Sequence, residues 1–186
     1  MYKYFKKLNY PVNVRKKDLR MAKYLITQLG GPAGELGAAL RYFSQKFAMP
    51  DEKGQALLND IACEELGHCE MIGTMFRQLV KDATIDELEK AGLGGYFTDH
   101  GKGVYPIDAA GNPFSALTFN STGDVLADLS EDMAAEEKAR ATYEHLIDLA
   151  TDDDVIQPLL FLRQRELVHF ARFKELYDYY KVKFGK

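Results

Sequence analysis

The sequence predicts an all-α protein, a four-helix bundle with one long crossover between its second and third helices. Three observations support this prediction. Apolar residues recur at helical spacing over four long segments. A stretch rich in Gly and Pro, residues 92–123, separates the second segment from the third. A Glu-x-x-His motif occurs in both the second and the fourth segment. Because 186 residues are enough for one sizeable core, we expect residues 1–186 to form a single domain.

Residues 1–17 are expected to form an N-terminal arm before the first helix. Residues 1–23 carry eight Lys or Arg and one Asp, although the whole chain has a net charge of −4. A basic run can contact nucleic acid or a membrane. Here it is interleaved with Tyr and Phe, which favours an arm that packs on protein. We therefore expect no nucleic-acid or membrane partner, and predict that the arm packs on a neighbouring subunit.

The first bundle helix is predicted over residues 18–48, with an interruption at Gly30-Gly31-Pro32. Proline fits the first turn of a helix but not its interior, so the chain should break or kink there. The second helix is predicted over residues 51–81, because Met49-Pro50-Asp51 ends one helix and caps the next. A short helix over residues 84–91 follows.

Residues 92–123 are predicted to form the crossover loop. Loops of this length are uncommon inside compact domains unless they have a role. One such role is to connect two helices whose ends lie at opposite ends of a bundle. The third helix is predicted over residues 124–150 and the fourth over residues 155–181, with Pro158 in its first turn. Apart from the paired Glu-x-x-His motif, we see no internal repeat.

The two Glu-x-x-His motifs, Glu65 with His68 and Glu166 with His169, are the strongest functional signal. A Glu and a His three positions apart on a helix point to one side, so both can reach the same point. Two such motifs facing each other in a bundle, with one inward Glu from each remaining helix, make a di-iron or di-manganese carboxylate site. Carboxylates clustered inside a bundle without metal would be costly. The pattern therefore predicts a dinuclear metal enzyme.

Glu35 is the candidate ligand on the first helix. It lies between Gly34 and Leu36-Gly37, and neighbouring glycines let another backbone or a ligand come close. Tyr42 follows seven residues later on the same helical face. We expect its hydroxyl to orient Glu35.

Two ligand positions have a neighbouring alternative. On the third helix, Glu136 and Glu137 are both available, and the apolar stripe of that helix lies on the side of Glu136, which we prefer. On the second helix, Glu64 also shares a face with His68. The matching spacing in the fourth helix favours Glu65.

At these residues the chain resembles the manganese catalase family, especially its short members, the spore-coat CotJC-type proteins. The resemblance extends over nearly the whole chain. The motifs that carry it are the Lys-Lys-Leu-Asn-Tyr-Pro arm, Gly30–Glu35, Glu64–Ile72, Gly111–Phe114, Ala127–Leu129, Ala134–Glu136 and Arg165–His169. Together they are far more specific than a Glu-x-x-His motif alone.

The resemblance implies a ferritin-like fold with two manganese ions. The metal ligands it implies are Glu35, Glu65, His68, Glu136 and His169. It also implies that Glu166 acts as an acid and base beside the metals rather than as a ligand. Some members place an Arg just before the Glu of the third helix, paired with that acid. This chain has Ala135 there, so Glu166 could swing onto the metal as in di-iron proteins.

The implied activity is the disproportionation of hydrogen peroxide to water and oxygen, with general acid–base catalysis by Glu166 and a supporting role for Tyr42. The family forms hexamers, which implies self-association as a homohexamer. One alternative is a di-iron carboxylate oxidase or peroxidase of rubrerythrin or bacterioferritin type, because protein ligands alone rarely decide between Mn and Fe. The other alternative is a mainly structural spore-coat protein.

The apolar segments and the cysteines of the chain indicate where the protein acts in the cell. No segment approaches the roughly 20 apolar residues of a membrane span, and no apolar segment of a secretory signal follows the basic N-terminus. Cys63 and Cys69 are too far apart on one predicted helix to form a disulfide. We expect them to be reduced thiols and the protein to be cytoplasmic, or a component of the spore coat.

Overall fold

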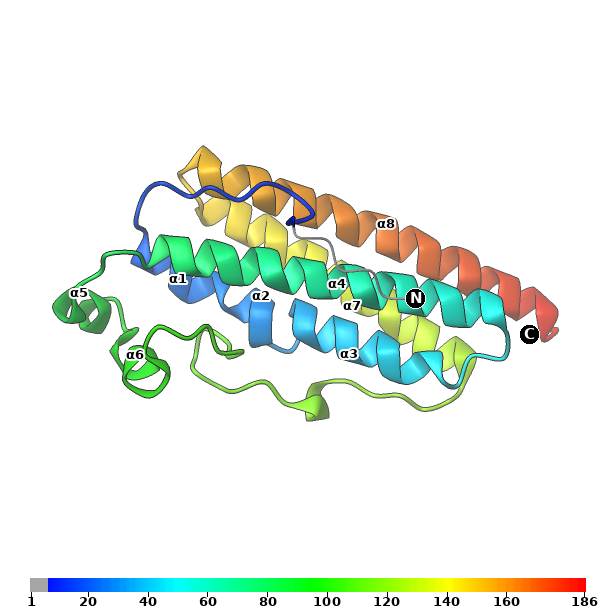
Figure 1. Cartoon of the computed structure of the whole chain (residues 1–186). Coiled ribbons are helices and arrows are strands. Elements are labelled where there is room, and N and C mark those ends of the chain that lie inside the picture. The colour runs from blue at the N-terminus through cyan, green and yellow to red at the C-terminus, as the bar shows by residue number, and fades with distance from the viewer. Residues whose placement is uncertain (1–6) are drawn as a thin grey trace.

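Figure 1 shows the computed structural model of the chain, in which residues 7–186 are described. Four long helical segments lie side by side and form a bundle. Their helices are α1 (Leu19–Leu25), α2 (Thr27–Gly30), α3 (Glu35–Lys46), α4 (Glu52–Leu79), α7 (Val125–Leu149) and α8 (Asp153–Lys183). The described residues contain no β-strand, only one isolated bridge. The predicted all-α four-helix bundle is confirmed.

The first bundle segment is broken, as predicted, and consists of α1, α2 and α3 placed roughly end to end (Figure 1). Close backbone packing explains the glycines at the break. A Cβ atom on Gly30 would lie 2.3 Å from the carbonyl carbon of Pro106, and one on Gly34 would lie 2.8 Å from the carbonyl oxygen of Thr27. The equivalent atom on Gly37 would make only ordinary contacts, at 3.8 Å or more. Of the two glycines that flank Glu35, only Gly34 is therefore required by a close approach.

The crossover connects opposite ends of the bundle, because α4 ends at one end and α7 begins at the other (Figure 1). It contains α5 (Ile85–Lys90), α6 (Gly94–His100) and the 3₁₀ helix η1 (Ala116–Thr118). The prediction of a loop without helices over residues 92–123 was therefore wrong at α6. This helix begins with two glycines, which locally favour a turn. It is held by packing of Tyr96 and Phe97 on Phe76 of α4, a contact between distant parts of the chain.

The later part of the crossover runs along α3 (Figure 1). Two buried side chains of α3 hold it there. Arg41 donates a hydrogen bond to the carbonyl oxygen of Thr118 at 3.4 Å, and Gln45 donates to that of Asn120 at 3.3 Å. These contacts fix the helix that carries Glu35.

The described part of the N-terminal arm packs on its own chain. The ring of Tyr10 stacks on that of Phe161 in α8, with centroids 5.0 Å apart. Arg15 forms an ion pair of 2.8 Å with Asp154. These arm residues therefore pack on α8 of their own chain, which offers the aromatic and acidic partners, and the packing of the arm on a neighbouring subunit stays a prediction. The remaining aromatic residues of the arm, within residues 1–6, lie outside the described part of the chain.

Two clusters of buried apolar side chains lie along the bundle, one on each side of a polar layer. The first includes Leu25, Met75, Phe76, Leu146 and Leu159. The second includes Leu58, Ile61, Leu129, Phe173 and Leu176. On α4, α7 and α8, the segment between these two sets carries acidic and imidazole side chains. Within residues 7–186, none of the helices is long and apolar enough to cross a membrane.

Of two details expected for the long helices, the position of Pro158 in the first turn was wrong and the state of the cysteines is confirmed. Helix α8 begins two residues earlier than expected, because Asp152 caps it by accepting a hydrogen bond from the backbone of Asp154. Pro158 therefore lies in the second turn rather than the first, and the helix continues through it to Lys183. Cys63 and Cys69, both on α4, are free thiols as predicted.

Candidate metal centre

The polar layer gathers six acidic and imidazole side chains from the four bundle helices. They are Glu35 of α3, Glu65 and His68 of α4, Glu136 of α7, and Glu166 and His169 of α8. None is more than 2% exposed. Every metal-ligand candidate from the sequence is therefore buried in the same layer, together with the predicted acid–base residue.

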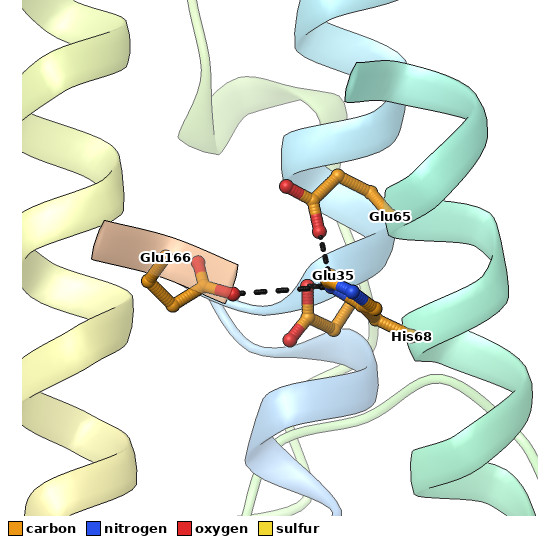
Figure 2. A group of neighbouring side chains, drawn as sticks. All are labelled: Glu35, Glu65, His68 and Glu166. Atoms are coloured by element: carbon orange, nitrogen blue, oxygen red, sulfur yellow. Dashed lines mark hydrogen bonds and ion pairs between the residues drawn. The ribbon is translucent and has the colours of Figure 1, made fainter. Parts of the chain in front are cut away.

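The six side chains form two overlapping groups of four, and in each group one potential ligand atom per residue lies within 4.8 Å of the others. The first group contains Glu35, Glu65, His68 and Glu166 (Figure 2). The second contains Glu65, Glu136, Glu166 and His169. Each group therefore has its own Glu and its own His, and the two groups share Glu65 and Glu166. This arrangement offers two adjacent cation sites with two carboxylates in common.

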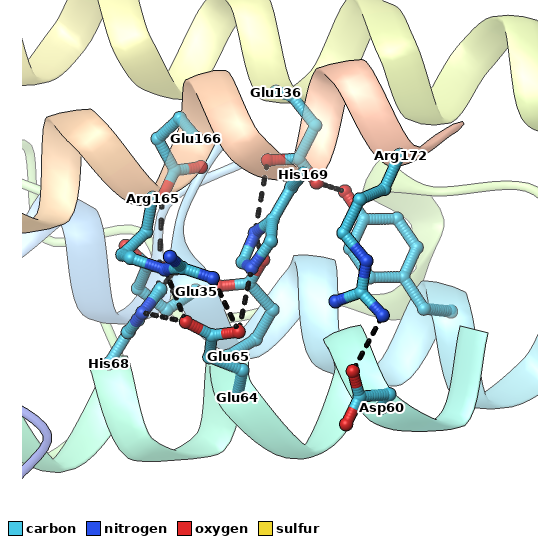
Figure 3. Close-up of polar contacts among 11 residues, drawn as sticks. Glu35, Asp60, Glu64, Glu65, His68, Glu136, Arg165, Glu166, His169 and Arg172 are labelled. Carbon is cyan, nitrogen blue, oxygen red and sulfur yellow. Dashed lines mark hydrogen bonds and ion pairs between the residues drawn. The ribbon is translucent and has the colours of Figure 1, made fainter. Parts of the chain in front are cut away.

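Glu65 lies between the two imidazoles (Figure 3). Its Oε2 atom is 2.8 Å from Nδ1 of His68, and its Oε1 atom is 2.8 Å from Nδ1 of His169. The imidazole rings stack with their centroids 5.7 Å apart. One carboxylate thus faces both rings with one oxygen each, which is the geometry of a bridging ligand.

Burial and mutual repulsion perturb the acidic groups of this layer. Burial and then the neighbouring carboxylates raise the pKa of Glu35 and that of Glu166 well above the usual value. Burial also opposes ionisation of Glu65, but the two adjacent imidazoles lower its pKa below the usual range. Burial therefore favours the protonated form of Glu35 and of Glu166, and binding of divalent cations would oppose this effect.

Burial and contacts distinguish each preferred Glu from its neighbour in the sequence. Glu136 is 1% exposed and belongs to the second group, whereas the side chain of Glu137 is 43% exposed and pairs with Arg140 at 2.8 Å. Glu64 is in neither group and faces the outer nitrogens of the imidazoles. The preferred residues Glu136 and Glu65 therefore belong to the groups of ligand candidates, whereas their neighbours Glu137 and Glu64 do not.

Tyr42 lies at this layer, but its hydroxyl donates to Glu136 and not to Glu35, so the expected partner was wrong. The hydroxyl of Tyr143 on α7 donates to Glu35 instead. Residues seven positions apart on one helix are separated by roughly 10 Å along its axis. A tyrosine therefore reaches across to the facing helix more easily than back to the Glu on its own helix.

Tyr143 is a residue that sequence reasoning missed, although a signal for it was present. Corresponding site residues of the two halves of the chain are separated by the same offset, 101 residues. The pairs are Glu35 and Glu136, Tyr42 and Tyr143, Glu65 and Glu166, His68 and His169, and Glu64 and Arg165. The internal repeat is thus more extensive than the paired Glu-x-x-His motif. Each half supplies a tyrosine that holds the Glu of the other half.

Replacing Tyr143 by Phe should weaken Mn²⁺ binding by about 10-fold, because removing the partner of a ligand typically costs 10–100-fold in metal affinity. Calorimetric titration of the metal-free protein with Mn²⁺ measures this loss. Tyr42→Phe should behave similarly, because the two contacts are equivalent. Tyr24→Phe is the matched control, since Tyr24 is 41% exposed on α1. Equal affinity in Tyr143→Phe and the control would contradict the assigned contact.

The six residues fit a pair of divalent metal ions. Several of their buried polar atoms form no hydrogen bond among the described residues, namely Glu166 Oε1, His68 Nε2, His169 Nε2, and the facing atoms Glu65 Oε1 and His169 Nδ1, which are 2.8 Å apart but not in hydrogen-bonding geometry. Buried polar atoms normally have a partner. Carboxylate and imidazole are the donors that suit Mn²⁺ and Fe²⁺. Four carboxylates also balance the charge of two divalent ions.

The chain is similar to known proteins over nearly its whole length. Residues 1–184 match the family described as manganese containing catalase. The chain is 51% identical to protein CotJC of Bacillus subtilis (strain 168), over 97% of this chain and 95% of that protein. It is 35% identical to a manganese catalase of Bacillus subtilis, over 95% of this chain and 71% of that protein. The crystal structure of KatB, a manganese catalase from Anabaena, matches with a TM-score of 0.85 and 35% identity, over 96% of this chain and 80% of that chain.

Proposed function

The chain belongs to the family of manganese containing catalases, and from this membership we propose that it disproportionates hydrogen peroxide to water and oxygen at a pair of manganese ions. One observation carries the proposal: two groups of four buried ligand candidates share Glu65 and Glu166. Shared carboxylates keep two cations close enough to act on one small substrate. The family relationship supports manganese as the metal and hydrogen peroxide as the substrate.

The proposed ligands follow from the two groups. Glu35 and His68 would hold one ion, Glu136 and His169 would hold the other, and Glu65 would be a ligand to both. The bridging role is supported by the 2.8 Å distances from the two oxygens of Glu65 to the two imidazoles. When bound, the manganese pair supplies the two-electron oxidation and reduction that peroxide disproportionation requires.

Glu166 is the proposed acid and base of the reaction. It is 2% exposed and lies in both groups, so it can reach a substrate placed at either ion. Burial and the neighbouring Glu35 and Glu65 raise its pKa well above the usual value, which is the direction expected of a carboxyl group that donates a proton. A carboxyl group in this position can take a proton from one peroxide and return it to the oxygen that leaves as water.

A cavity of about 10 Å³ at the site supports a very small substrate. This is close to the smallest volume that holds one water molecule. Small side chains form part of its wall, including Ala38, Ala135 and Ala139, and acidic side chains face it from Glu35, Glu136 and Glu166. Peroxide is little larger than water, whereas an organic substrate would require the helices to separate. Ala135, where some family members have an Arg, lines this cavity together with Glu166.

The proposal is tested by loading the metal-free protein with Mn²⁺ and measuring oxygen release from hydrogen peroxide with an oxygen electrode. The expected result is two manganese ions per chain and oxygen in the stoichiometry of disproportionation. A protein that binds manganese but releases no oxygen would contradict the enzyme proposal, and would favour the structural alternative.

A di-iron oxidase or peroxidase is the second candidate, and one observation favours it. Glu166 lies within the same 4.8 Å groups as the other ligand candidates, so it can serve as a sixth ligand. One Glu and one Glu-x-x-His motif from each half is the ligand set of di-iron carboxylate proteins as well. Elemental analysis of the protein purified from its native source distinguishes the two, since manganese supports the catalase and iron the alternative.

We also propose that the chain self-associates, as a homohexamer, and that it acts in the cytoplasm or the spore coat. Large apolar side chains exposed on the described surface support self-association, among them Phe47, Leu117 and Val182, each at least 80% exposed. The similarity to CotJC extends over nearly the full length of both chains. Light scattering of the purified protein gives its oligomeric state directly.

A further inference from the structure

The outer nitrogens of the two imidazoles face the same carboxylate (Figure 3). The Oε1 atom of Glu64 is 3.7 Å from Nε2 of His68, and its Oε2 atom is 3.1 Å from Nε2 of His169. Glu64 therefore offers one oxygen to each ring. Glu65 does the same on the inner side, where it faces the two Nδ1 atoms. Each imidazole thus lies between two carboxylates that are neighbours in the sequence.

Metal binding at Nδ1 of each imidazole would require a hydrogen-bond acceptor at its Nε2 atom. If Nδ1 of each imidazole binds a metal, the neutral ring must carry its proton on Nε2. Both imidazoles are fully buried, and neither Nε2 atom has a hydrogen-bond partner among the described residues. A buried N–H group without an acceptor is costly. Glu64 is the nearby group that can accept from both rings after a small adjustment of both contacts.

Arg165 fixes the position of Glu64. Its Nε atom is 2.5 Å from Oε1 and its Nη2 atom is 3.2 Å from Oε2, so the guanidinium binds both carboxylate oxygens. A two-point Arg–carboxylate contact sets orientation as well as distance. The side chains of Glu64 and Arg165 are 21% and 27% exposed, so the pair lies at the edge of the buried layer. Arg165 leaves two lone-pair directions of Glu64 free for the imidazoles.

We propose that Glu64 is a positioning residue that holds both imidazole ligands at once, and that Arg165 acts through Glu64. The inference rests on the dinuclear metal site proposed above. It assigns one carboxylate to set the tautomer and the orientation of two ligands that belong to different metal ions. Loss of Glu64 should therefore weaken both ion sites together rather than one of them.

The chain contains a matched control on the same two helices. Arg172 of α8 pairs with Asp60 of α4 at 2.6 Å, one turn before Glu64 on α4 and two turns after Arg165 on α8 (Figure 3). This pair joins the same helices with the same chemistry, but the structure shows no contact between it and either imidazole. Asp60→Ala and Arg172→Ala therefore report what the loss of an ion pair between α4 and α8 does by itself.

The test titrates the metal-free full-length protein with Mn²⁺ and follows binding by calorimetry. Glu64→Ala should bind both ions 10–100-fold more weakly than the wild type, the usual cost of removing the partner of a ligating His. Glu64→Gln should lose less, because its amide oxygen still accepts from one ring. Asp60→Ala should bind as the wild type does. At saturating Mn²⁺, electron paramagnetic resonance should still show a coupled pair in Glu64→Ala, since all direct ligands remain.

The role of Arg165 is tested by a double-mutant cycle. Arg165→Ala should weaken Mn²⁺ binding less than Glu64→Ala does, and should add almost nothing when Glu64 is already Ala. Additive losses would show that Arg165 does not act through Glu64. Equal affinities in Glu64→Ala and Asp60→Ala would overturn the inference, and so would a spectrum of isolated ions in Glu64→Ala, which would make Glu64 itself a ligand. If Glu64→Ala does not fold, Glu64→Gln and Arg165→Ala still decide between these outcomes.

Failure of this inference can be distinguished from failure of the proposed function. If the wild type binds no pair of manganese ions or releases no oxygen from peroxide, the proposed function is contradicted. If the wild type does both and the Glu64 variants match the Asp60 control, only the positioning role is contradicted.

Discussion

Glu65→Gln should abolish oxygen release from peroxide and should lower the affinity for Mn²⁺ by at least about 100-fold. Glu65 is fully buried and is the carboxylate whose two oxygens face both imidazoles at 2.8 Å. An amide has nearly the same shape but no charge, and only one of its two terminal atoms can bind a cation. One ion therefore keeps an oxygen ligand at this position, the other loses its ligand, and the bridge between the two sites is lost. Calorimetric titration with Mn²⁺ and an oxygen electrode measure the two effects.

The matched control for Glu65→Gln is Glu70→Gln, which makes the same chemical change at an exposed position of α4. It should bind manganese and release oxygen as the wild type does. Circular dichroism of each variant checks that the helices remain folded. If Glu65→Gln binds two manganese ions with the affinity of the wild type, the bridging assignment is wrong. In that case Glu166, the other carboxylate shared by both groups, would become the candidate for the bridging ligand.

Glu166→Gln should keep both manganese ions and should lower the rate of oxygen release by about 10²–10⁴-fold, the usual contribution of general acid–base catalysis. The amide preserves the volume of the side chain in a site where it is 2% exposed, but it cannot exchange a proton. Metal content, measured by elemental analysis after gel filtration, and the rate of oxygen release therefore separate the two roles open to Glu166.

Each outcome for Glu166→Gln selects one role. Two ions with a low rate support an acid and base beside the metals. Loss of one or both ions would contradict that role, and would make Glu166 a ligand, as in the di-iron alternative. Glu137→Gln is the control, because Glu137 lies on the surface of α7 and pairs with Arg140. It should leave both metal content and rate unchanged.

The sequence alone predicted the bundle and six of the buried polar residues. Helical spacing and breakers located every long helix within a few residues. The Glu-x-x-His motifs indicated which faces of α4 and α8 lie inside the bundle, because side chains three residues apart on a helix lie on the same side. The apolar stripe of the third helix separated Glu136 from Glu137 for the same reason. Local periodicity was sufficient for these predictions because each depends on one helix only.

Contacts between helices were harder to predict. The partner of Tyr42 was wrong, because the hydroxyl reaches the facing helix rather than its own. Tyr143 was missed, although it lies at the same offset from Tyr42 as the other paired residues of the site. Helix α6 and the placement of the described arm were also missed. Each of these depends on side chains that meet only when distant segments pack.

By itself, then, the sequence determined which residues lie on the inner faces of the helices, and hence the chemical nature of the site. Only the tertiary structure decided how the two halves of the chain combine. It showed that Glu65 and Glu166 are common to both groups, that each tyrosine holds the Glu of the opposite half, and that Glu64 faces both imidazoles. The physical reason is that helical periodicity sets direction around one axis, whereas distances between helices depend on how their side chains pack together.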